Sequence, residues 1–116
     1  MLFDYKLTEE QNCEIISLSG ELIDKNQAAD MIKAIDGLLE SGKTRFVVEL
    51  GDLKYMNSSG LNILIQLLTK TRAKGGETVI CHVNKKVNEL LLITKLNTLF
   101  KVVDTKEEAL KKLQSQ

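Results

Sequence analysis

Apolar residues along this chain occur in two kinds of stretch, which predict two kinds of element. Short and nearly continuous apolar runs, typical of strands, fall at residues 3–7, 14–19, 46–50, 78–83 and 99–103. Between them, apolar residues recur every three or four positions, as on the buried side of an amphipathic helix. These helical stretches cover residues 28–39, 58–74, 84–93 and 105–113. The pattern predicts the order β-β-α-β-α-β-α-β-α.

That order indicates a fold class. Strands separated by helices imply a mostly parallel sheet with right-handed crossovers. The polar segment 8–12 between the first two strands predicts a hairpin with a loose loop, which would add an antiparallel strand. We therefore predict a single α/β domain over residues 1–116. It should have a four- to five-stranded mostly parallel sheet with an antiparallel N-terminal strand, and about four helices.

Cap residues stand where the predicted helices begin. Asp24 or Asn26 can cap the first helix, and Asn84 can cap the third. Their short side chains can accept a hydrogen bond from an N–H group of the first helical turn. Thr105 and Glu108 have the spacing of a capping box at the start of the fourth helix, in which each side chain bonds the other's backbone N–H.

Charge and hydropathy exclude several classes of protein. The 16 basic and 16 acidic residues give a formal net charge of +0, which argues against direct nucleic-acid binding, because phosphate neutralisation needs a basic face. No apolar run is long enough to span a bilayer, and no signal-peptide pattern opens the chain. We expect a cytoplasmic protein without membrane insertion.

The cysteines do not form a metal-binding motif. Cys13 and Cys81 lie far apart in sequence, each in an apolar strand-like segment, and no CxxC motif is present. Buried free thiols are the expected outcome. Since His82 is the single histidine, we expect no zinc site, and no cofactor is predicted.

The most informative segment is 57–61, with the sequence Asn57-Ser58-Ser59-Gly60-Leu61. It presents two hydroxyls where a buried strand gives way to an apolar helix. A helix N-terminus has N–H groups without intrahelical partners and carries partial positive charge, so it favours an anion. The segment is therefore a candidate site for a bound or covalently attached phosphate. The structural alternative is that Asn57 or Ser58 simply caps the helix.

Two motifs carry a family resemblance that covers nearly the whole chain. Residues 20–22, Gly-Glu-Leu, followed by Asp24, resemble the Gly-Glu-Leu-Asp loop of the STAS domain, and residues 57–61 resemble its Asp-Ser-Ser-Gly-Leu phosphorylation loop. The chain is similar in particular to the bacterial anti-sigma-factor antagonists. It differs in having Asn57 where the family usually has aspartate, an extra residue, Ile23, before Asp24, and Asn62 where a small residue is common.

The resemblance implies a mechanism. Such an antagonist binds a serine-kinase anti-sigma factor and so frees a sigma factor. The kinase phosphorylates the first serine of the loop, here Ser58, with Ser59 the lesser candidate. Phosphorylation breaks the complex and a PP2C-type phosphatase restores it. The residues expected to contact the partner are Leu22, Asp24, Asn57, Ser58, Ser59, Gly60 and Leu61.

Two other functions stay open at this point. A STAS module can act without a phosphate cycle, as a scaffold or a transporter-associated regulatory subunit. The strand-to-helix turn at Ser58 also superficially resembles the nucleophile elbow of a hydrolase. That elbow needs Gly-x-Ser-x-Gly, whereas Met56 occupies the leading position and His82 is the only histidine base. We therefore expect no catalytic residue and no enzymatic activity.

Overall fold

The computed structural model describes residues 2–115, so Met1 and Gln116 of the predicted domain lie outside it. A five-stranded sheet forms the centre, in the order β1-β2-β3-β4-β5. The strands are β1 (Asp4–Glu10), β2 (Cys13–Leu22), β3 (Arg45–Met56), β4 (Glu77–Cys81) and β5 (Lys101–Val103). β1 is antiparallel to β2 and the other neighbours are parallel. The predicted fold class is confirmed.

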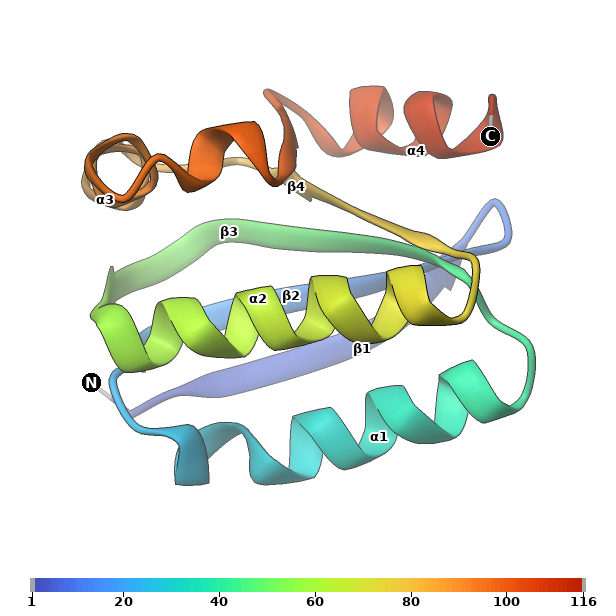
Figure 1. The fold of residues 1–116 in the computed structure, drawn as a ribbon, viewed down its shortest axis with the longest axis horizontal. Helices are drawn as coiled ribbons and strands as arrows, with labels where there is room; N and C mark the ends of the chain where they lie inside the picture. Colours follow the sequence, from blue (N-terminus) through green and yellow to red (C-terminus); the bar gives the residue numbers. More distant parts are fainter. Residues whose placement is uncertain (1, 116) are drawn as a thin grey trace.

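Helices follow the strands in the predicted order. They are α1 (Ala29–Glu40), α2 (Ser58–Ala73), α3 (Lys85–Ile93) and α4 (Lys106–Gln114), with two short 3-10 helices, η1 (Lys25–Ala28) and η2 (Leu96–Thr98). α1 and α2 run side by side along one side of the sheet, and α4 lies on the other side (Figure 1). None of the described helices combines the length and apolar character that crossing a bilayer requires.

Because each central strand is covered on both faces, its apolar run is continuous. Successive side chains of a strand point to opposite faces. Val48 of β3 packs with α1, α2 and α3 in the larger cluster, whereas Val47 packs with α4 in the smaller one. Three residues of α4 belong to that smaller cluster: Ala109, Leu110 and Leu113.

Several boundaries differ from the prediction. β1 extends to Glu10, and the hairpin loop is only Gln11 and Asn12, both with positive φ (52° and 63°). Two such residues make the tight hairpin turn whose twist matches that of the strands. The prediction of a loose loop was therefore wrong. β3 continues to Met56 through two register shifts against β2. β4 ends at Cys81 because His82 has φ of 56° and leaves the extended conformation.

The caps are mostly as predicted. Asn84 accepts a hydrogen bond from the Val87 N–H, and Thr105 accepts one from the Glu108 N–H. Of the predicted capping box only this half forms, because the Glu108 carboxylate accepts from the Thr105 hydroxyl and not from its N–H. Asp24 caps the short helix η1 rather than α1, in a capping box with Gln27. The first helical segment therefore starts earlier, as a 3-10 turn.

The two cysteines are free and buried, as predicted. Burial raises the pKa of the Cys13 thiol. Burial also raises the pKa of Cys81, to about 12, and the nearby charges of Glu49 and Glu107 act in the same direction. Both thiols are therefore protonated at neutral pH. A reactive cysteine, by contrast, is present as the thiolate.

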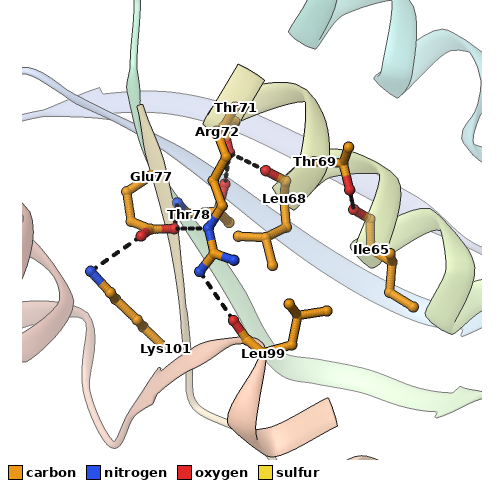
Figure 2. A network of polar contacts seen from close by, with 9 residues as sticks. All are labelled: Ile65, Leu68, Thr69, Thr71, Arg72, Glu77, Thr78, Leu99 and Lys101. Atoms are coloured by element: carbon orange, nitrogen blue, oxygen red, sulfur yellow. Dashed lines mark hydrogen bonds and ion pairs between the residues drawn. The ribbon is translucent and has the colours of Figure 1, made fainter. Parts of the chain in front are cut away.

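A polar network around Glu77 fastens the beginning of β4 to the elements beside it (Figure 2). Arg72 Nε and Lys101 Nζ lie 3.1 Å from the two carboxylate oxygens, and the Thr78 N–H donates over 3.0 Å. Arg72 Nη2 also donates to the Leu99 carbonyl over 3.1 Å. Burial pushes the pKa of Glu77 up, but these donors outweigh it and hold the pKa below its ordinary value.

Glu77 should therefore stabilise the fold at neutral pH and lose this effect in acid. A depressed carboxyl pKa means that the stabilisation is present above the unfolded pKa of about 4.3 and is lost as the pH falls through the folded value. We expect Glu77→Gln to lower the free energy of unfolding by about 1–3 kcal/mol at pH 7, since it removes charge-assisted hydrogen bonds. Urea denaturation from pH 7 to pH 3 should show the difference from wild type shrinking in acid.

Glu14 provides the matched control. This carboxyl is also buried, but burial and the Glu9 charge raise its pKa. Ionised Glu14 therefore opposes folding, and Glu14→Gln should not lower stability at pH 7 by this mechanism. A loss of the same size in both variants would contradict the role of the Glu77 network.

Candidate functional site

The site is built on the junction between β3 and α2. Asn57 is extended (φ −104°, ψ −170°), and its Oδ1 accepts a hydrogen bond from the Gly60 N–H over 3.0 Å. Its carbonyl accepts the Leu61 N–H over 2.9 Å. Asn57 is thus the N-cap, and α2 begins at Ser58. Because Asn57 does the capping, neither serine is needed for it.

The amide of Asn57 makes a second contact that an aspartate could not make. Its Nδ2 donates to the Ile23 carbonyl over 3.1 Å. The Asn57 side chain therefore joins the beginning of α2 to the loop that follows β2. Asn84 has the same arrangement at α3: its Nδ2 donates to the Leu53 carbonyl over 2.6 Å. An asparagine at each junction is explained by this double use of the side chain, as acceptor and as donor.

Gly60 lies buried against the end of β2. A Cβ built on it would stand 2.3 Å from the Leu22 carbonyl oxygen and 2.7 Å from Met56 Cγ. Glycine is required here by the packing of α2 on its own domain. The prediction that Gly60 admits a partner is therefore corrected, because the space above its Cα is already occupied by Leu22.

The other predicted site residues separate into two groups. Ser58, Ser59 and Asp24 are exposed and Asn57 is half-buried. Leu22 and Leu61, by contrast, are only 0% and 3% exposed and belong to the larger core cluster. The prediction that these two leucines contact a partner is wrong for their side chains, which support the site from beneath.

The two serines line different hollows. Ser58 borders one of about 430 Å³ between the end of β3 and α3, and the residues around it include Tyr55, Asn57, Lys86, Glu89 and Ile93. Ser59 borders another, of about 540 Å³, beside the loop after β2. Among the described residues, neither hydroxyl has a hydrogen-bond partner in the domain. Both are available to other molecules.

The residues from β3 and α3 around Ser58 were missed from sequence. Tyr55 is 46% exposed and Ile93 is 79% exposed. A signal existed for Ile93, because it lies out of phase with Val87 and Leu91, the buried residues of α3. Apolar residues outside the buried stripe of a helix stand on the surface.

His82 is engaged elsewhere. Its Nε2 accepts a hydrogen bond from the Lys106 N–H at the start of α4, over 3.2 Å. Within residues 2–115 no hydrogen bond joins it to Ser58, whereas a nucleophile and its base must lie within reach of each other. In the described structure His82 and Ser58 are therefore not joined as a nucleophile and its base.

Comparison with known proteins decides the family. The family model of the STAS domain matches residues 4–109. The chain belongs to the STAS domain family. The anti-sigma F factor antagonist of Paenibacillus polymyxa is 31% identical over 102 residues, which cover 86% of each chain. The recognition of this family from residues 20–24 and 57–61 is confirmed.

Solved structures agree on the STAS fold. An anti-sigma factor antagonist from Mycobacterium paratuberculosis superimposes with a TM-score of 0.80 at 20% identity, covering 97% of this chain and 94% of that one. The anti-sigma factor antagonist SpoIIAA in its unphosphorylated form superimposes with a TM-score of 0.75 at 20% identity, covering 97% of this chain and 100% of SpoIIAA. The phosphorylated form of Bacillus SpoIIAA superimposes with a TM-score of 0.73 at 20% identity, covering 94% of this chain and 98% of SpoIIAA. At this identity the matches show the shared fold.

The contact between Gly60 and Leu22 can be tested by two alanine substitutions. Gly60→Ala should lower the free energy of unfolding by about 1–3 kcal/mol, because the added methyl group meets a backbone carbonyl. Gly37→Ala, in α1, is the matched control, since nothing lies within 4 Å of a Cβ there. It should stabilise the STAS domain by about 0.5–1 kcal/mol through helix propensity. Thermal and urea denaturation measure both, and equal effects would contradict the close packing.

Proposed function

We propose that this STAS domain is an anti-sigma-factor antagonist that binds a serine-kinase anti-sigma factor and is switched off by phosphorylation of Ser58. A PP2C-type phosphatase then returns it to the binding form, and the cycle operates in the cytoplasm. The observation that carries this proposal is an exposed serine at the first position of α2, beside an asparagine that already caps the helix. The 31% identity to an anti-sigma F factor antagonist supports the class of partner.

The domain can accept a phosphate at Ser58 without unfolding. Phosphorylation adds about 1.5–2 negative charges at neutral pH. The positive end of the α2 dipole lies next to this position, and a helix N-terminus stabilises an anion. The side chain points to solvent, so no buried group has to move. The phosphate therefore changes the surface while the fold persists.

The same phosphate would weaken binding to a partner. At an interface the dianion must lose its water or face a carboxylate, and either costs free energy. A penalty of roughly 4 kcal/mol corresponds to a thousandfold loss of affinity. The surface proposed to bind the kinase comprises Asp24, Asn57, Ser58 and Ser59. Leu22, Gly60 and Leu61 hold that surface in place from the core.

Phosphate mapping tests the choice of serine. The protein is incubated with a serine-kinase anti-sigma factor from the same organism and ATP, and the modified residue is located by mass spectrometry. We expect one phosphate, on Ser58, lost in Ser58→Ala and kept in Ser59→Ala. The matched pair is informative because both serines are exposed on the same helical turn. Phosphate on Ser59 alone would contradict the assignment.

Binding tests the switch itself. Ser58→Asp should weaken binding to the kinase by about a hundredfold or more, because it places a negatively charged carboxylate where the phosphate would stand. Ser58→Ala should bind about as well as wild type, and circular dichroism should show all three proteins folded. Equal affinity of wild type and Ser58→Asp would count against a phosphate switch. It would favour the alternative, a STAS interaction module without a phosphate cycle, serving as a scaffold or a transporter-associated regulatory subunit.

A further inference from the structure

Three side chains with metal-binding atoms meet where β4 ends beside the first half of β3. One ligand atom each from Glu49, Cys81 and His82 lies within 4.8 Å of the others, and this is the one such group of three among the described residues. Glu49 and Cys81 are paired in register on adjacent parallel strands. They come together through the sheet, although 32 positions separate them in the chain.

The backbone of His82 brings the imidazole to this pair. In a regular strand the side chains of residues 81 and 82 would point to opposite faces. His82 instead adopts a left-handed conformation with φ of 56°, which is uncommon for a residue other than glycine. Its N–H donates to the Asp104 carbonyl over 3.3 Å, and its Nε2 accepts the Lys106 N–H. Such a backbone persists where the surroundings hold it, and it is found often at binding sites.

A recess gives access to the group from solvent. It has a volume of about 180 Å³, and Ser17, Glu49, Gly51, Asp52 and His82 are among the residues that line it. His82 lies against Gly51, because a Cβ built on Gly51 would stand 3.4 Å from His82 Cβ, in ordinary van der Waals contact. A water molecule can provide a fourth ligand from this side. Cys81 is buried and lies at the inner end of the cluster.

We propose that Glu49, Cys81 and His82 form a binding site for one divalent transition metal ion, with Zn²⁺ the best-suited ion. Zinc takes sulfur, nitrogen and oxygen ligands in a tetrahedral arrangement, and hard cations such as Mg²⁺ do not use thiolate. On binding, the Cys81 thiol gives its proton to solvent and the sulfur forms the bond to the metal. The ligand atoms must draw closer. The hydrogen bond from the Lys106 N–H to Nε2 must also break, because Nε2 either binds the metal or carries the imidazole proton when Nδ1 binds it.

The charges around the cluster favour a cation. The carboxylates of Glu49 and Glu107 both act on Cys81, and Asp52 lines the recess. The cation that opposes them, Lys106, forms an ion pair with Glu10 over 2.9 Å. The local negative charge therefore exceeds the positive charge, which attracts a divalent ion.

Cobalt titration of the whole protein tests the site, because a cobalt–thiolate bond gives a charge-transfer band. We expect a band that saturates at one Co²⁺ per chain and is abolished by Zn²⁺. Cys81→Ser should remove the band, and Cys13→Ser, the other buried cysteine, should leave it. His82→Asn should weaken Co²⁺ binding at least about tenfold. Asparagine is chosen because it also tolerates the left-handed conformation.

A second readout does not depend on the variants. When Zn²⁺ is added to the wild-type protein, the amide resonance of Lys106 should shift more than those of the Ser58 region, since Nε2 stops accepting its hydrogen bond when the imidazole binds the metal. Three results would overturn the proposal: no band at millimolar Co²⁺, a band that survives Cys81→Ser, or unchanged affinity in His82→Asn. None of them bears on the phosphorylation of Ser58, because the two tests use different residues.

Discussion

The close contact between the beginning of α2 and the end of β2 is the constraint on which the site depends. Gly60 lies directly against the Leu22 carbonyl, and the Asn57 amide bonds to the next carbonyl, that of Ile23. Two successive carbonyls of the β2 exit thus fix the position and the start of the helix. A side chain at residue 60 would push α2 away, and Ser59 would leave the hollow that it shares with Asp24.

Two departures from the family pattern, Asn57 and Ile23, meet in this contact. The extra residue Ile23 contributes the carbonyl that the Asn57 side chain needs as an acceptor. An aspartate could cap α2 equally well but could not donate that bond. The inserted residue and the asparagine are therefore one local solution, in which a hydrogen bond between two loops takes the place of a charge at the helix end.

Most of the fold could be predicted from periodicity, because each central strand is buried on both faces and each helix has one apolar stripe. The positions of Asn57, Ser58 and Ser59 followed from cap chemistry, which is local. What could not be predicted depends on contacts between distant segments. Leu22 and Leu61 look like any apolar residues beside a motif, and only packing shows that they are buried. The neighbourhood of Glu49, Cys81 and His82 likewise needs the register of β3 against β4 and a left-handed residue after β4. Neither the register nor the left-handed conformation can be predicted from the spacing of residues along the chain.

The order of the strands across the sheet is the order in which they occur along the chain. Each strand thus joins the free edge left by the one before it, and none has to enter between two that are already paired. During synthesis on the ribosome the sheet can therefore grow in one direction, from the β1–β2 hairpin outward, with each emerging helix closing over the newest pair. The last strand, β5, has only three residues. Assembly ends on an edge too short to recruit a strand from another molecule.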